Sequence, residues 1–542
     1  MASAATELLV GKIEELLEKE ASSIAGVRDQ VDEIKQELIS MKSFLEDAEG
    51  KKIDTEGEKE WVSSIRNSVY DVEDIIDEFM YRMYEQQNGG RLARWIRKCI
   101  QIPEYLWKDS QSRIPEQCKM HDLMRELALS TSEREKFGVV FDRRGVMEET
   151  RARRLAIHTT EGEIESCTGL LQLRSFLVFP SGLRSPLFSN TWSSGFNLLR
   201  VLDLENVPID KLPNNLVYLF NLRYLNLRGT RIKRLPKSIG RLHNLQTLDI
   251  SDTDVKILPG GTSKLINLRH LYMGHFNNSG FESFICARGI RASSHISMFK
   301  KLQDLFFVQS DKNMIRLLRN MTQLRMLGIT NVKESDEIEL CASIQKMKIL
   351  VWLNLSVNDT SDVFLRIDAL ASPPPHLESL FLRGKLESIP CWFCSLQCLT
   401  HIDLLWCRLE EDLLPHIEAL PCLERIVLDN AYVGKELSFS RGFVKLTHLE
   451  LFNFRALNNV SVEKGVMPNL QYLGLRSCKK LKTLPHGIEY LTRLETLYLE
   501  SVTKKLVESI REGGVDRPKV QHIRIIDHHY KTSSGLSYES LS

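Results

Sequence analysis

Leu222-Arg-Tyr-Leu-Asn-Leu227 is a hexapeptide that returns, with small changes, about every two dozen residues along most of the chain. Close copies are Leu199–Leu204 (LRVLDL), Leu245–Ile250 (LQTLDI) and Leu268–Met273 (LRHLYM), and looser copies begin at Leu302, Leu324, Leu350, Leu377, Leu399, Leu423, Leu446, Leu470, Leu494 and Val520. The last two aliphatic residues of each copy lie two positions apart, which is the spacing of side chains on one face of a β-strand. Each copy therefore predicts a short strand that buries these two residues and turns their neighbours to the other side.

A fixed period of about 20–29 residues with this pattern is typical of a leucine-rich-repeat solenoid, whose units bury their apolar side only against each other. The sequence thus predicts an α/β leucine-rich-repeat solenoid over residues 151–526. The run Arg153–His158 is expected to open it, and Leu173–Val178 to form its first full repeat strand. The polar tail, residues 527–542, is expected to be disordered.

Residues 1–88 predict a different architecture, an α-helical bundle of three or four amphipathic helices. The positions from Val27 to Ala48 alternate apolar steps of four and three, the heptad pattern of packed helices. Thr55 and Glu58 form a capping box before a second such stripe, which begins at Trp61. Gly89-Gly90 ends this domain, and residues 89–150 are interpreted as a linker region before the repeats.

Composition narrows the classes of function. The net charge of +1 hides an acidic head, because residues 1–90 carry 10 Lys+Arg against 22 Asp+Glu, whereas residues 91–160 carry 15 against 10. This distribution lacks the concentrated basic stripe of a nucleic-acid-binding protein. There is no secretory signal and no apolar run of about 18 residues, and the eleven cysteines are odd in number, so a cytoplasmic protein is expected.

No constellation of residues predicts catalysis or metal binding. Nothing has the spacing of a nucleophile and its base, so we do not expect an enzyme. Four cysteines invite comparison with a zinc site, namely Cys391, Cys394, Cys398 and Cys407. Cys391 and Cys394 follow a turn where other copies place core residues, so they are interpreted as structural and no metal is expected.

Three segments together resemble the coiled-coil class of plant nucleotide-binding leucine-rich-repeat immune receptors. They are Tyr70–Phe79 (YDVEDIIDEF), similar to the acidic signature of the N-terminal domain; Cys118–Ala128 (CKMHDLMRELA), similar to the Met-His-Asp element of the nucleotide-binding module; and the repeat form Ile232–Ile250. The resemblance implies a four-helix coiled-coil-type domain and a winged-helix remnant within residues 89–150. It also implies a role in innate immunity, with ADP or ATP as the family's nucleotide.

The chain departs from that family at the nucleotide-binding domain. Only about thirty residues separate the bundle from the Met-His-Asp element, whereas such a domain needs over a hundred. Each Gly-Lys pair, at Gly11, Gly50, Gly384 and Gly434, lacks a following Ser or Thr, so no phosphate-binding loop is encoded. We therefore expect no nucleotide cofactor, with His121 and Asp122 only a remnant on a helix that buries neighbouring apolar residues.

The sequence leaves the roles of two N-terminal features open, an acidic helix face and the first helix. The acidic face Asp71, Glu73, Asp74, Asp77 and Glu78 either docks on a basic patch of the repeats, as the resemblance implies, or is solvated. The first helix, Met1–Glu20, is similar to the motif with which some of these receptors form membrane pores, but Glu7 departs from it. An ordinary bundle helix is favoured, so membrane association at the periphery of the plasma membrane is a minor alternative.

The concave face of the repeats is the predicted binding site, because aromatic, arginine and histidine side chains recur there and these types contribute most to protein interfaces. By strand alternation the face comprises Val201, Asp203, Tyr224, Asn226, Arg228, His270, Tyr272, Phe306, Trp352, Asn354, Phe381, Arg383, His401, Asp403, His448, Tyr472, Arg476, Tyr498 and Arg524.

The favoured function is that of an immune-receptor-like protein. Its repeats would recognise a pathogen effector or a guarded host protein, and its helical domain would mediate self-association, contacts with other receptors, or signalling to a hypersensitive response. Lacking the switch, it would be a decoy, a regulator or a truncated product. Two alternatives remain: a partial form of an ADP/ATP-switched receptor, and a generic leucine-rich-repeat scaffold.

Overall fold

The computed structural model describes residues 139–141, 153–157, 172–179, 196, 198–276, 286–292, 294–357, 363–532 and 535–541. These residues fall into two compact units, one ending at Arg200 and one that begins essentially at Val201 and continues to the C-terminus. The predicted domains at 1–88 and 89–150, including His121, Asp122 and the acidic helix motif, lie almost wholly outside the described residues.

In the first unit, short parallel strands lie side by side. Strand β1 (Val139–Phe141) pairs with β2 (Arg154–Ile157), with Val139 opposite Leu155, and β2 pairs in turn with β3 (Ser175–Val178). The repeat leucine Leu173 and the strand residue Phe176 are fully buried, and the Phe176 ring lies 6.0 Å from that of Phe196. The strand predicted within Leu173–Val178 is thus confirmed.

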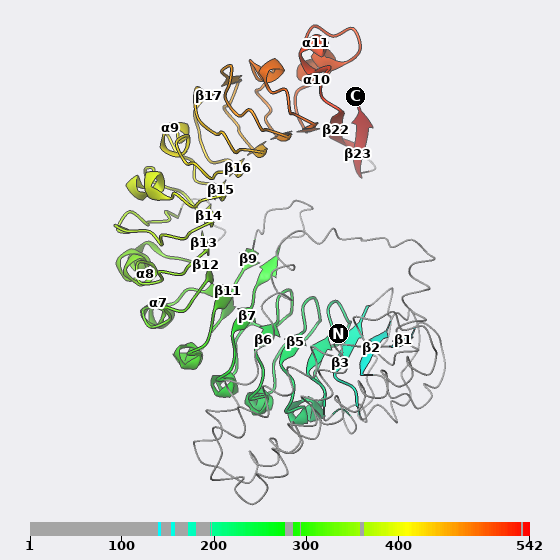
Figure 1. Cartoon of the computed structure of the whole chain (residues 1–542), viewed down its shortest axis with the longest axis vertical. Coiled ribbons are helices and arrows are strands. Elements are labelled where there is room, and N and C mark those ends of the chain that lie inside the picture. Colours follow the sequence, from blue (N-terminus) through cyan, green and yellow to red (C-terminus); the bar gives the residue numbers. More distant parts are fainter. Residues whose placement is uncertain are drawn as a thin grey trace, which may run out of the picture. The chain divides into compact units, whose positions relative to one another are not determined.

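The second unit is a ladder of parallel strands, one from each repeat (Figure 1). In order of pairing the strands are β4 (Val201–Asp203), β5 (Tyr224–Asn226), β6 (Thr247–Asp249), β7 (His270–Tyr272), β11 (Asp304–Gln309), β12 (Met326–Thr330), β13 (Trp352–Ser356), β14 (Ser379–Arg383), β15 (His401–Leu405), β16 (Arg425–Asp429), β18 (His448–Phe452), β20 (Tyr472–Arg476), β21 (Thr496–Glu500) and β22 (Ile525–Thr532). Equivalent leucines pair across each step, for example Leu225 with Leu248 and Leu449 with Leu473.

The chain returns between strands through helical turns on the other side of the second unit (Figure 1). These are the 3-10 turns η1 (Asn214–Tyr218), η2 (Lys237–Arg241), η3 (Gly260–Lys264), η4 (Ser294–Met298), η5 (Glu334–Asp336), η6 (Cys391–Ser395) and η7 (Ile488–Tyr490), and the helices α7 (Lys312–Leu318), α8 (Glu337–Ile344), α9 (Leu414–Ile417), α10 (Lys504–Ile510) and α11 (Arg517–Val520). Proline directly precedes η1, η2, η3 and η6. Proline has no N–H, and N–H groups at the start of a helical turn have no partner within the turn, so nothing is lost there.

Short strands fill the remaining irregular positions. They are β8 (His275–Phe276) paired with β9 (Cys286–Arg288), β10 (Ile290–Arg291) beside β11, and β17 (Glu436–Phe439) paired with β19 (Asn459–Val462).

The core lies between the strands and the returning turns. Leu225, Leu227 and Leu248 are 0% exposed, as are their counterparts along most of the ladder. Each side chain is covered by the next repeat, so the burial is collective and grows with every unit added. The predicted α/β leucine-rich-repeat solenoid is therefore confirmed.

Most strands of the ladder are followed by a residue with a positive φ angle, two positions after the last repeat leucine. Asparagine or aspartate occupies this place at Asn206 (φ 58), Asp252 (φ 55), Asn430 (φ 48) and Asn453 (φ 57), and glycine at Gly229 (φ 68). These residue types adopt positive φ with least strain. The turn lets the backbone bond to the next repeat, as where the N–H of Asn206 donates to the Arg228 carbonyl at 2.7 Å.

The end of the ladder corrects two predictions. Residues 527–542 were expected to be disordered, but β22 extends to Thr532 and pairs antiparallel with β23 (Gly535–Ser540). The last repeat also begins at Ile523 rather than Val520, because Leu497 pairs with Ile526. Arg524 consequently precedes the strand and is not at a concave-face position.

The physical reason is that the last repeat needs a cover. Ile526 is 1% exposed and Leu541 is 8% exposed, and the Leu541 N–H donates to the Ile526 carbonyl at 2.7 Å. A polar composition hid this role, because a capping hairpin turns only one side of its strands to the core.

Two neighbouring isoleucines test whether this hairpin is a folded cap. Ile526→Asp places a charge in the core, and we expect it to lower the urea midpoint by an amount equivalent to about 3 kcal/mol or more. Ile525→Asp changes a side chain that is 39% exposed and should have little effect. Equal midpoints for the two variants would contradict an ordered cap.

Candidate protein-binding face

The side chains that alternate with the repeat leucines form one surface, which we call the strand face. The first position of each strand contributes Val201, Tyr224, Thr247, His270, Asp304, Met326, Trp352, Ser379, His401, Arg425, His448, Tyr472, Thr496 and Ile525. The third position contributes Asp203, Asn226, Asp249, Tyr272, Phe306, Gly328, Asn354, Phe381, Asp403, Val427, Glu450, Gly474, Tyr498 and Asp527, by the same pairing. Except for Arg524, the predicted residues lie on this face, with Arg228, Arg383 and Arg476 two positions further along their repeats.

An aromatic cluster occupies the middle of the strand face. Phe306 stacks on Trp352 with 4.6 Å between ring centroids, Trp352 lies 5.0 Å from Phe381, and Tyr272 lies 5.2 Å from Phe306. Phe306 and Trp352 belong to strands β11 and β13, which are separated by β12. They meet because β12 presents Gly328 between them, where an added Cβ would lie 3.4 Å from the Trp352 ring.

A backbone irregularity sharpens this cluster. The pairing of β11 with β12 shifts between Leu305 and Val308, and Phe307 adopts a left-handed φ of 55°. The Phe307 side chain is fully buried and meets Trp352 edge-on at 6.1 Å. Trp352 is consequently 8% exposed. The aromatic side chains predicted on this face therefore form a packed apolar patch.

An acidic centre adjoins the cluster at Asp304. One carboxylate oxygen lies 2.7 Å from His270 Nδ1, and the Tyr272 hydroxyl donates to the same oxygen at 3.1 Å. Burial, with the Asp304 charge next in importance, raises the pKa of Tyr272 above its usual range. The hydroxyl therefore stays a donor that orients the carboxylate.

A second charged group is built around Glu450 on β18. Its carboxylate lies 3.5 Å from the Arg425 guanidinium, 3.4 Å from that of Arg476 and 2.8 Å from His448 Nε2. Burial acts to raise the pKa of Glu450, but the His448 hydrogen bond and the Arg476 charge outweigh it and lower the pKa. Glycine at position 474 on the neighbouring strand provides space for the Glu450 side chain, because an added Cβ there would lie 3.1 Å from Glu450 Cγ.

Stacked rings extend from this group to the end of the ladder. His448 stacks on Tyr472 at 4.3 Å, Tyr498 on His529 at 4.7 Å, and His529 on Tyr538 at 5.6 Å. The Arg476 guanidinium lies over Tyr498 at 4.5 Å, in cation–π geometry. Tyr538 on the capping strand is 72% exposed, so the row ends in an accessible ring.

Several aspartates on or beside the strand face have raised pKa values, so they stay protonated to a higher pH than usual. Burial raises the pKa of Asp403 to about 7, opposed by the charge of Arg425. Asp403 is 1% exposed, and its Oδ1 atom has no hydrogen-bond partner. Burial likewise raises the pKa values of Asp249 and Asp429 to about 6.

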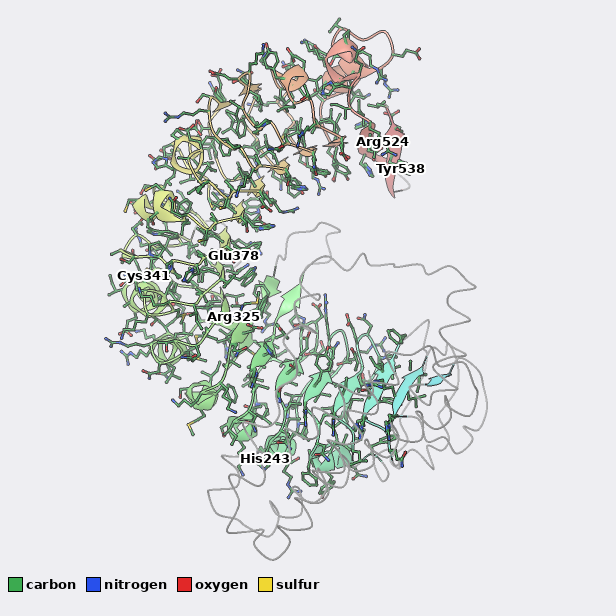
Figure 2. The ribbon with its side chains drawn as sticks, viewed as in Figure 1. His243, Arg325, Cys341, Glu378, Arg524 and Tyr538 are labelled. Carbon is green, nitrogen blue, oxygen red and sulfur yellow. The ribbon has the colours of Figure 1, made fainter. Side chains whose placement is uncertain are left out.

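Charged side chains border the strand face at the residue after the first leucine of several repeats. Among the described repeats of the second unit they are Arg223, Arg269 and Arg325, then Glu378, Glu424 and Glu495, and finally Arg524 in the last repeat. Figure 2 shows Arg325 and Glu378 on the strand side of the unit, and Cys341 of α8 on the helix side. A partner lying across β5 to β21 would therefore meet positive charge beside the earlier strands and negative charge beside the later ones.

Sequence reasoning missed the charged members Asp304, Arg425 and Glu450. They occupy positions equivalent to the predicted ones, so the alternation pattern could have found them. It also misplaced Cys391 and Cys394, which are exposed on η6 while Trp392 and Phe393 take the core positions. Among the described residues, no group of three or more metal-binding side chains comes together.

Comparison with known proteins places the chain in a family. Residues 172–499 match the leucine-rich repeat region, and residues 5–114 match the Rx N-terminal domain. The chain is 43% identical over 438 residues to the disease resistance protein RPM1 of Arabidopsis thaliana, covering 79% of this chain and 46% of that protein. The chain belongs to the coiled-coil, leucine-rich-repeat class of plant disease-resistance proteins.

Other relatives of this class agree. The disease resistance protein RPP8 of Arabidopsis thaliana is 29% identical over 444 residues, which are 80% of this chain and 48% of that protein. The chain thus spans about half the length of these relatives. Among solved structures, a leucine-rich-repeat protein of Leptospira interrogans has a TM-score of 0.44 and 22% identity, over 66% of this chain and 90% of that one. None of the described helices of this disease-resistance-type chain is long and apolar enough to cross a membrane.

Asp403 provides a test of the strand face's electrostatics. Its folded-state pKa of about 7 exceeds the usual value near 4, so ionisation costs stability as pH rises from about 4 to 7. We expect Asp403→Asn to raise the urea midpoint at pH 8, by an amount on the order of 2 kcal/mol, with the gain disappearing near pH 4. The exposed Glu378→Gln is the matched control. A pH-independent difference would argue against the burial of an ionised Asp403.

Proposed function

We propose that the chain is an immune-receptor-like protein of plants whose strand face binds a protein partner, either a pathogen effector or a guarded host protein. Its membership of the class of plant disease-resistance proteins supports a role in plant immunity. The single observation that carries the binding role is the packed aromatic cluster of Phe306, Trp352 and Phe381, bordered by Arg325 and Glu378. Apolar anchors ringed by charged groups are the usual centres of protein interfaces.

The helical N-terminal domain is proposed to mediate self-association, contacts with other receptors, or signalling. Docking of the acidic motif Asp71–Glu78 on a basic patch stays a prediction. The described repeats supply candidate partners for such a motif in Arg223, Arg269 and Arg325, because these lie at equivalent positions of nearby strands. An attraction of this kind weakens with added salt.

We propose a binding role without catalysis, in the cytoplasm. Free cysteines suit a reducing compartment, and the structure shows free thiols at Cys341, Cys391, Cys394, Cys398, Cys407, Cys422 and Cys478. Burial raises the pKa values of Cys341 and Cys478 to about 12, so these thiols stay protonated and unreactive. Peripheral association with the plasma membrane remains the weaker alternative.

The partner-binding role is tested by removing the central anchor. Trp352→Ala is expected to weaken partner binding at least tenfold, equivalent to about 1.4 kcal/mol, because it deletes the ring that Phe306 and Phe381 pack against. Tyr218→Ala on η1 is the control, since that ring is 51% exposed and lies away from the strand face. The measurement is quantitative proximity labelling in infected leaves, followed by affinity measurement with the captured partner.

Because Trp352 is largely buried, a second variant separates binding from folding. Arg325→Glu changes an exposed side chain and is expected to alter binding without changing the urea midpoint. If both variants retained the same partners with the same affinity as the unmodified chain, the strand face would not be the binding site.

We also propose that the chain has no ADP/ATP cycle of its own, since the sequence contains no Gly-Lys-Ser or Gly-Lys-Thr. Equilibrium dialysis of the purified chain with radiolabelled ADP and Mg²⁺ is expected to show no retention above that of a heat-denatured sample. Stoichiometric retention would instead favour a nucleotide-switched receptor.

A further inference from the structure

A row of side chains outside the strand face joins consecutive repeats at the residue immediately before the first leucine. We call it the turn row, and it comprises Asn221, Asn244, Asn267, Lys301, Gln323, Ile349, His376, Cys398, Cys422, Lys445, Asn469 and Arg493. Neighbours in this row touch. Lys301 Nζ donates to Asn267 Oδ1 at 3.1 Å, and an Arg493 N–H donates to Asn469 Oδ1 at 2.8 Å.

Cys398 and Cys422 are consecutive members of the turn row. Strands β15 and β16 pair His401 with Arg425, and this offset of 24 residues still holds where the Glu424 N–H donates to the Thr400 carbonyl at 2.8 Å. Two residues further back, the same offset aligns Cys398 with Cys422. Adjacent strands lie about 4.7–4.9 Å apart, which is within the Cα separation of about 4.4–6.8 Å that a disulfide spans.

The next member of the row supplies a charge. Lys445 Nζ lies 3.7 Å from the Cys422 Sγ, as the offset of 23 residues between β16 and β18 requires. The Lys445 ammonium group thus donates to the sulfur and is placed to assist thiol–disulfide exchange there. Both thiols are partly exposed, whereas Cys407 and Cys478 of the same repeats region are buried.

We propose that Cys398 and Cys422 form a redox-active pair that is oxidised by small-molecule disulfides such as glutathione disulfide. The Cys422 thiolate attacks one sulfur of glutathione disulfide, forming a mixed disulfide and releasing one glutathione thiolate. The Cys398 thiolate then attacks the Cys422 sulfur, forming the Cys398–Cys422 bond and releasing the second glutathione. The two cysteine protons end on the two glutathione thiols, so two thiols are oxidised and one disulfide is reduced.

The consequence is a covalent link between two consecutive repeats. It closes directly before β15 and β16, the strands that carry Asp403 and Arg425 of the strand face. The link removes conformational freedom from the unfolded chain, so the oxidised form should resist local separation of these repeats. This inference does not depend on the identity of any protein partner.

The test uses the full chain, fully reduced and then exposed to glutathione disulfide. Peptide mass mapping after rapid alkylation is expected to find Cys398 linked to Cys422, and the oxidised chain should have a higher urea midpoint than the reduced chain. In Cys398→Ser the reaction should stop at a glutathione adduct on Cys422, with no rise in midpoint. Lys445→Ala should slow adduct formation severalfold in that background.

Cys391→Ser is the matched control, because Cys391 is an exposed thiol on the adjoining turn η6. It should form the Cys398–Cys422 link at the rate of the unmodified chain. The inference would be overturned by separate glutathione adducts on Cys398 and Cys422 without a link, or by a link from either residue to Cys391 or Cys394. The reduced variants' urea midpoints show whether each one folds.

Discussion

The stacking of one repeat on the next holds the second unit together. The repeat that contains strand Tyr224–Asn226 turns Leu225 and Leu227 to one side, where only the neighbouring repeat can cover them. The backbone ladder and the left-handed turn residues hold the register that makes this covering possible. Every row described above, whether of leucines, aromatic rings, charges or cysteines, exists because this register persists from strand to strand.

The same register decides what chemistry each surface has. On the strand face it brings together residues about two dozen positions apart in sequence, so that Glu450 meets both Arg425 and Arg476. Glycine at a single position then lets side chains two strands apart touch, as Gly328 does for Phe306 and Trp352. Outside the face it aligns Cys398, Cys422 and Lys445. Small changes of residue type at equivalent positions thus give one scaffold several distinct surfaces.

Much of this could be predicted from sequence, because the repeat pattern specifies both period and orientation. The pattern placed Tyr272, Trp352 and Tyr498 on one face, where the structure also places them. The pattern failed at the last repeat. There Val520, Ile523 and Ile525 have the repeat spacing, but the true repeat begins at Ile523, three residues later than predicted. The pattern also could not predict how deeply residues of the strand face are buried. The 1% exposure of Asp403 and the packing of Phe307 against Trp352 result from contacts with neighbouring strands. The acidic motif at Asp71–Glu78 lies outside the described residues and remains a prediction.

We propose that the strand side of the repeats meets the protein partner. Hydroxyl-radical footprinting of the chain, with and without a captured partner, measures this directly by the oxidation of individual rings. We expect the partner to protect Phe381, Tyr472 and Tyr498 on the strand face while Tyr218 and Tyr490, exposed on the turns η1 and η7, oxidise at unchanged rates. Protection of Tyr218 and Tyr490 with unchanged oxidation on the strand face would contradict the claim.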